Sequence, residues 1–458
     1  MKSPIPLPPF FAVLLVLMAG ALQAQSPLDA YVQQGLHSNL LLQQKHLGLE
    51  KAQYSLKAAS SLFMPSVGLS GTYTHGQGGR TIAIPVGDML NPVYATLNQL
   101  TESQHFPQIE NVEQSFFPRH FYDVRMRTSM PLLNTSLQHN RSIRQEQLQL
   151  QEWEVKIYER ELILHIKQAY WGYLSALEAV RIWESALELV QKNLAVNESL
   201  LRNGSGLPAS VLRAQSELEG VKAQLLEAQN KAHTAQRYFN FLLNRDQTSA
   251  IEAVERPDER LEKIPQLLLQ AEGEEGGSRE ELQQLRTGER LQSSLLRLSQ
   301  QQGVPTVGAF LDLGLQAENM AYTKQAPYFL MGLSLDMPLF SGFRNRYEVR
   351  QARLDLKSSQ LQLDHTRQQL QLAARTARNE LATAYQHQAA ARQRLIAATS
   401  YFRLLERGYA EGTYSLIEFI DARNQLTSAQ LQQSITTYQV LSALAQYERQ
   451  TAHTTQHP

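Results

Sequence analysis

One short motif occurs twice in this chain of 458 residues and constrains the fold more than any other feature. GSGLPASVLRAQSEL (204–218) and GTYSLIEFIDARNQL (412–426) align without gaps at an offset of 208 residues. Each copy begins with a glycine, Gly204 or Gly412, and several apolar positions coincide downstream. An internal repeat predicts an architecture in which one structural unit is built twice.

The repeat extends upstream of this motif. MPSVGLSG (64–71) matches VPTVGAFL (304–311), and MPLL (130–133) matches MPLF (337–340). The offset falls from 240 to 207 between these pairs, so the first copy carries 33 extra residues, which we place in the segment 76–119. This segment is rich in Gly, Pro, Asn and Gln and has no sustained periodicity, which predicts a long loop.

These matches divide the chain into three parts after its first residues. We assign the first repeat to residues 25–250 and the second to residues 251–450. The polar tail, 451–458, is predicted to be disordered.

Each copy contains a predicted helix of unusual length with a strict seven-residue repeat. In the second copy, positions 356, 363, 370, 377, 384, 391, 398 and 405 are all Leu or Ala. In the first, positions 148, 155, 162, 169, 176, 183 and 190 are Leu, Val, Leu, Ala, Ala, Trp and Val. A sustained heptad predicts supercoiled helices that meet along a seam. The second helix has no Gly or Pro between 346 and 407 and so extends for about 90–100 Å.

The repeated motif predicts the tip of a helical hairpin. Glycine at the end of a helix favours a left-handed C-cap, and Ser415 with Glu418 forms a capping-box pattern, S-x-x-E. The returning helices are expected at about 208–243 and 415–450. The tip residues of interest are Gly204, Leu207, Gly412 and Ser415.

Four segments upstream of the long helices alternate with a period of two: 66–73, 120–130, 306–315 and 328–337. Such alternation between an apolar and a polar face predicts β-strands. The polar face carries Asp123, Arg125, Arg127, Asp312 and Asp336. The apolar face has two interpretations: it packs on a soluble core, or it faces lipid.

The lipid interpretation is favoured by strands of about ten residues with aromatic ends, as in membrane barrels. The polar face then lines water. Because four strands cannot close a barrel, and open edges are not tolerated in lipid, several chains must pool their strands. A trimer gives twelve strands, although the sequence demands oligomerisation more firmly than it fixes the number.

Composition and the N-terminus exclude several classes of protein. Residues 1–24 are typical of a signal peptide, with cleavage after Ala21 or Ala24, and an uncleaved anchor is the alternative. Lys plus Arg equals Asp plus Glu at 43 each, so nothing favours a nucleic-acid partner. There is no cysteine, H-E-x-x-H or G-x-S-x-G, and we expect no catalytic, metal or cofactor site. His165 is expected to be a packing residue of the seam.

The chain resembles the TolC-like outer-membrane efflux proteins over essentially all of its mature length. The resemblance rests on the tip motif G-x(6)-[VF]-[LI]-x-A-x(3)-L, the P-L-[LF] junctions and the [MV]-P-[ST]-V-G strand starts. It implies an α+β membrane protein: a homotrimer with a twelve-stranded barrel in the outer-membrane lipid, continuous with a coiled-coil tunnel in the periplasm. Segment 76–119 is then extracellular.

The resemblance also implies function. The protein is expected to be a passive exit duct, without enzymatic activity, for tripartite efflux or type I secretion. Its hairpin tips are expected to dock to a periplasmic adaptor and an inner-membrane transporter. Glu418 and Asp421 match the acidic positions that constrict the family's tunnel entrance, whereas the first copy has Ser210 and Arg213 there. For Glu418 a capping role alone remains open. The alternative function is a periplasmic coiled-coil scaffold or adaptor.

Overall fold

The computed structural model describes residues 27–115, 117, 119–253, 257–270, 279–318 and 323–451. The predicted signal peptide and residues 452–458 of the predicted tail lie outside these ranges, whereas Thr451 ends a helix. The chain divides into two compact units. The helical unit comprises Met1–Gln53, Glu146–Leu291 and Leu356–Pro458, and the sheet unit comprises Tyr54–Gln145 and Gln292–Asp355.

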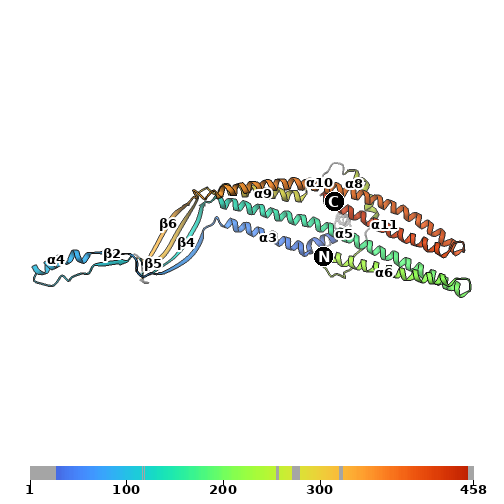
Figure 1. Ribbon diagram of the computed structural model, residues 1–458, viewed down its shortest axis with the longest axis horizontal. Coiled ribbons are helices and arrows are strands. Elements are labelled where there is room, and N and C mark those ends of the chain that lie inside the picture. The colour runs from blue at the N-terminus through green and yellow to red at the C-terminus, as the bar shows by residue number, and fades with distance from the viewer. Residues whose placement is uncertain are drawn as a thin grey trace, which may run out of the picture. The chain divides into compact units, whose positions relative to one another are not determined.

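The described residues form the predicted long helices and four predicted strands, together with further elements in segment 76–119 (Figure 1). The helices are α2 (Pro27–Ser38), α3 (Leu40–Ser61), α4 (Val86–Leu100), α5 (Thr135–Arg202), α6 (Pro208–Leu242), α7 (Pro257–Leu261), α8 (Ile264–Gln270), α9 (Glu280–Gln300), α10 (Arg344–Ala410) and α11 (Leu416–Thr451). The strands are β1 (Ser66–His75), β2 (Thr81–Ile84), β3 (Val112–Ser115), β4 (His120–Leu133), β5 (Thr306–Glu318) and β6 (Pro327–Asp336).

In the helical unit, α6 turns back along α5 and α11 turns back along α10 (Figure 1). The heptad positions predicted for the seam are all buried or half-buried. The largest core cluster gathers Tyr170, Trp171 and Phe239, which are at most 2% exposed, with Leu28 of α2 and Leu42 of α3. Among the described residues, no helix is long and apolar enough to cross a membrane.

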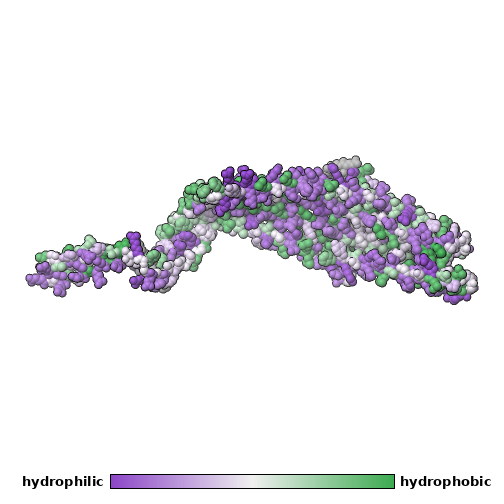
Figure 2. Space-filling view, viewed as in Figure 1, coloured by the Kyte–Doolittle hydropathy of each residue, from purple (hydrophilic) through white to green (hydrophobic). Residues whose placement is uncertain are grey.

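In the sheet unit, four antiparallel strands have the order β1-β4-β5-β6. The register aligns Leu69, Met126, Leu313 and Phe329 across the sheet. These residues belong to an apolar face whose large side chains are exposed, up to 78% for Leu69 (Figure 2). The apolar face therefore does not pack on a core within the chain. The two edge strands, β1 and β6, are antiparallel to each other because each of the three pairings is antiparallel.

Segment 76–119 is not the irregular loop that its sequence predicts. It contains the paired strands β2 and β3 and the helix α4. Two asparagines of α4 hold the returning chain: Asn91 exchanges two hydrogen bonds with the backbone of Ile109, and Asn98 exchanges two with Phe106. The prediction failed because four-residue strands are too short to show alternation and because Pro92 lies inside the helix.

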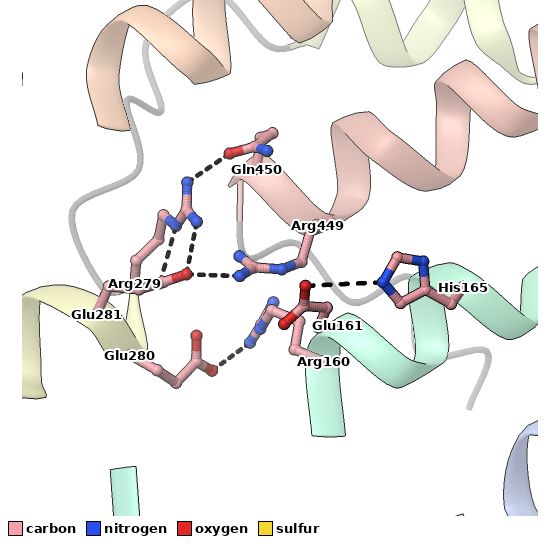
Figure 3. Close-up of polar contacts among 8 residues, drawn as sticks. All are labelled: Arg160, Glu161, His165, Arg279, Glu280, Glu281, Arg449 and Gln450. Atoms are coloured by element: carbon pink, nitrogen blue, oxygen red, sulfur yellow. Dashed lines mark hydrogen bonds and ion pairs between the residues drawn. The ribbon is translucent and has the colours of Figure 1, made fainter. Parts of the chain in front are cut away.

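A cluster of charges fixes the start of α9 within the helical unit (Figure 3). Glu281 accepts hydrogen bonds from Arg279 and from Arg449 of α11, and Glu280 pairs with Arg160 of α5. Acidic residues in a first helical turn also suit the helix dipole. His165, expected to pack in the seam, is instead 43% exposed, with Nε2 3.6 Å from Glu161 Oε1.

This cluster predicts a defined acid sensitivity. Burial alone raises the pKa of Glu281, but the hydrogen bonds from Arg279 and Arg449 outweigh burial and lower the pKa from 4.5 to about 2. A lowered carboxyl pKa contributes stability above pH 4.5 that is lost as the pH falls towards 2. Glu281→Gln should therefore lower the thermal midpoint of helical circular dichroism at pH 7, by an amount that shrinks below pH 4.5. The exposed Glu152→Gln is the control; equal effects of both variants at every pH would contradict the assignment.

Candidate functional site

The strand register places all five predicted polar-face residues on one side of the sheet. Arg127 lies opposite Asp312, and Thr306 lies opposite Asp336, so these even positions of β5 share a face with the odd positions of β4. Arg127 binds Asp312 through two parallel hydrogen bonds, Nε to Oδ1 at 2.7 Å and Nη2 to Oδ2 at 2.6 Å. Asp312 is 0% exposed, so this bidentate pair compensates a carboxylate that water does not reach.

The remaining charges of this polar face are arranged more openly. The Tyr328 hydroxyl donates to Asp123 Oδ1 (2.9 Å), and Arg125 Nη1 lies 3.6 Å from Asp123 Oδ2. Asp336 is exposed near the end of β6. The face thus combines paired and exposed charges, as expected of a surface in contact with water.

The two hairpin tips make the same backbone hydrogen bonds at the offset of 208 residues. The N–H of Gly204 donates to Leu201 O and that of Gly412 to Tyr409 O. The next two N–H groups of each tip donate to Leu200 O in the first copy and to Gly408 O in the second. Gly204 has φ +79° and Gly412 φ +76°, so both are in the left-handed conformation predicted for a glycine C-cap.

The helices that leave the tips start differently. Leu207 is the N-cap of α6, followed by Pro208 in its first turn. At α11, the Ser415 N–H donates to Glu418 Oε2 (2.7 Å) and the Glu418 N–H donates to Ser415 Oγ (3.3 Å), which is the predicted capping box. These hydrogen bonds from the backbone and side chain of Ser415 lower the pKa of Glu418.

Glu418 and Asp421 are both exposed on α11. Asp421 Oδ2 accepts a hydrogen bond from Gln425, a neutral amide. The capping role of Glu418 is therefore visible, and a role of either carboxylate at a channel entrance stays a prediction. In the described part of the chain, no three His, Cys, Asp or Glu side chains form a group able to hold a metal ion.

Two polar links join the first hairpin to the second near the tips, and sequence reasoning missed both. Asn197 of α5 donates to the Tyr409 hydroxyl of α10 (3.1 Å), and Arg423 of α11 donates to Glu217 Oε2 of α6 (2.8 Å). Arg423 is 3% exposed; burial lowers its pKa, and the bond to Glu217 opposes that effect. One signal was available, since Arg423 follows the buried Phe419 by four residues and lies on the same helical stripe.

Comparison with known proteins is consistent with these features. A family model described as "Outer membrane efflux protein" matches residues 31–245 and 275–451. The outer membrane protein TolC of Escherichia coli (strain K12) is 21% identical over 423 residues, which are 89% of this chain and 78% of that protein.

Solved structures share the fold. A membrane protein from Pseudomonas aeruginosa has a TM-score of 0.74 at 16% identity, with 93% of this chain and 94% of that chain covered. The Campylobacter jejuni CmeC outer membrane channel has a TM-score of 0.73 at 14% identity, with 93% and 85% covered. At such low identity these structures support the fold alone.

The link between Arg423 and Glu217 is testable against a matched surface pair. Arg213 also lies near Glu217 (2.9 Å) but its side chain is 58% exposed. Arg423→Met should cost about 1–3 kcal/mol, because it removes a hydrogen bond between buried charged groups. Amide exchange near the tips should then quicken about 5–150-fold, whereas Arg213→Met should change it little. Equal exchange rates in the two variants would show that the Arg423–Glu217 contact does not stabilise the packing of the two hairpins.

Proposed function

The chain belongs to the outer membrane efflux protein family, and on this premise we propose that it is the passive outer-membrane exit duct of a tripartite efflux or type I secretion system. Its location is the outer membrane, and its relatives by sequence and fold are channels. The observation that carries the proposal is the exposed apolar face of a four-stranded sheet with two unpaired edges.

The sheet has the dimensions and polarity of part of a membrane barrel. Its strands contain 10 to 14 residues, and strands of about 9–11 residues cross a bilayer when tilted. Because β6 and β1 run in opposite directions, β6 of one copy can pair with β1 of the next in the same antiparallel pattern. Three copies then close a barrel of about twelve strands, an even number as in known outer-membrane barrels. The apolar face meets lipid and the face with Arg127 and Asp312 lines the lumen.

The helical unit supplies the rest of the duct. In the proposed homotrimer, the hairpins α5–α6 and α10–α11 form a coiled-coil tunnel in the periplasm. The tips around Gly204 and Gly412 dock to a periplasmic adaptor and an inner-membrane transporter, and the transporter selects the cargo. Segment 76–119 is extracellular in this arrangement. The chain acts without catalysis, by providing a path.

A periplasmic scaffold or adaptor is the alternative function. Such a protein has supercoiled helices but gains nothing from a sheet that exposes Leu69, Met331 and Leu333 to water. Exposure of this extent destabilises a soluble protein and favours a lipid-facing surface.

Two neighbouring residues of β6 test the assignment of faces. Leu333, 72% exposed, lies on the apolar face, and Ser334 lies on the polar face. An arginine facing lipid near the bilayer midplane costs about 2–4 kcal/mol. Leu333→Arg should therefore abolish the detergent-extracted trimer seen by native mass spectrometry, and Ser334→Arg should leave it. A soluble periplasmic monomer in the wild type would overturn the proposal.

A substitution of Asp421 tests whether acidic residues at the second tip constrict the channel entrance. If the carboxylates of Asp421 narrow a cation-attracting entrance, Asp421→Ala should raise single-channel conductance and weaken block by multivalent cations in planar bilayers. Glu113→Gln, a change at an exposed position of β3, is the control. Unchanged conductance and unchanged block in Asp421→Ala would reduce Asp421 to a solvated helix residue.

A further inference from the structure

Two histidines flank segment 76–119, one on each side. His75 is the last residue of β1 and His120 is the first residue of β4, and the two lie directly opposite each other in the register. Both side chains are exposed. Their rings are 4.6 Å apart between centroids, with planes inclined by 36°. Side chains this close across an antiparallel pair can share one ligand.

The hydrogen bonds of the two rings determine which nitrogen is available. His75 Nδ1 lies 2.7 Å from Arg119 O. A carbonyl oxygen only accepts, so His75 carries its proton on Nδ1 and, when neutral, leaves the lone pair of Nε2 free. His120 Nδ1 lies 2.7 Å from the Tyr73 hydroxyl, which can donate or accept. When the hydroxyl accepts a hydrogen bond from Nδ1–H, the lone pair of His120 Nε2 is free as well. Fixing one imidazole nitrogen by a hydrogen bond is how proteins orient the other towards a metal.

We propose that His75 and His120 form a transition-metal site that links the two ends of segment 76–119. Two imidazoles suit Cu²⁺, Ni²⁺ or Zn²⁺ and not the oxygen-seeking Mg²⁺ or Ca²⁺. Water fills the remaining coordination positions, because the described residues offer no third His, Cys, Asp or Glu in a group with this pair. Tyr73 is a positioning residue that holds the ring of His120 through Nδ1.

A bound metal ties β1 to β4 where the extra segment leaves the sheet. One backbone hydrogen bond, from Gly76 N–H to Arg119 O at 3.3 Å, already joins the two ends of the segment there. A clip that closes a long loop stabilises the closed form by restricting the open chain. The site is therefore a structural clasp for segment 76–119, independent of the cargo and of the proposed duct.

Binding of Ni²⁺ and Zn²⁺ to the full chain, purified in detergent without a polyhistidine tag, tests the site by isothermal titration. The wild type should bind one ion per chain that His75→Gln and His120→Gln do not bind. Tyr73→Phe should bind it about 10–100-fold more weakly, as expected when a metal ligand loses its orienting hydrogen bond. His105→Gln, at an exposed histidine inside the same segment, should bind as the wild type does, and Mg²⁺ should not bind.

Amide exchange supplies a second measurement. Zn²⁺ should slow exchange at Gly76 and its neighbours in the wild type and in His105→Gln, but not in His75→Gln. Equal metal binding by wild type, His75→Gln and His120→Gln would overturn the proposal, as would an equal loss in His105→Gln. Unaltered affinity in Tyr73→Phe would show that Tyr73 does not position the ring of His120.

Discussion

The backbone of a sheet with open edges must find partners, and in lipid it can find them only in other strands. The chain has four antiparallel strands, and each edge strand, β1 or β6, is paired within the sheet on one side only. One face of that sheet exposes large apolar side chains, and the other holds a bidentate pair between the exposed Arg127 and the buried Asp312. A single copy provides neither hydrogen-bond partners for the outer edges of β1 and β6 nor a cover for the apolar face. In the proposed duct, identical copies satisfy both at once, which is why oligomerisation follows from the sheet before any helix is considered.

In the proposed duct, the long helices form a tunnel wall that has no thick hydrophobic core. Small alanines on the heptad, such as Ala377 and Ala391, are buried and let neighbouring helices approach closely. Large side chains gather elsewhere, above all around Tyr170, Trp171 and Phe239, where α2, α3, α5 and the end of α6 meet. Each long helix is followed, before the chain reverses, by a residue in the left-handed conformation. Gly204 and Gly412 provide that conformation at both tips.

Features with a local pattern were predictable from the sequence. The four predicted strands begin within one residue of their expected starts, and the tips form the predicted caps, because alternation, heptads and glycine caps act between close neighbours. Features that depend on distant partners were missed. Arg423 meets Glu217 across 206 residues, and His75 meets His120 only through the register of β1 and β4. The helix α4 was missed because Pro92 lies inside it, and its contacts through Asn91 and Asn98 are made with the backbone of the returning chain.

The two hairpin tips make the same backbone hydrogen bonds but carry different charged side chains. In the proposed duct both helical hairpins reverse through the same turn, and the backbone hydrogen bonds of the two tips are correspondingly the same. A charged entrance needs only one of the two tips. Arg213 of the first copy pairs with Glu217, which also binds Arg423, whereas Asp421 of the second copy accepts a hydrogen bond from the neutral amide of Gln425. Glu418 stays ionised more readily than a free carboxyl because its cap lowers its pKa. In the proposed trimer, the duplicated turn occurs at all six hairpin tips, while the carboxylates of Glu418 and Asp421 occur at only three of them.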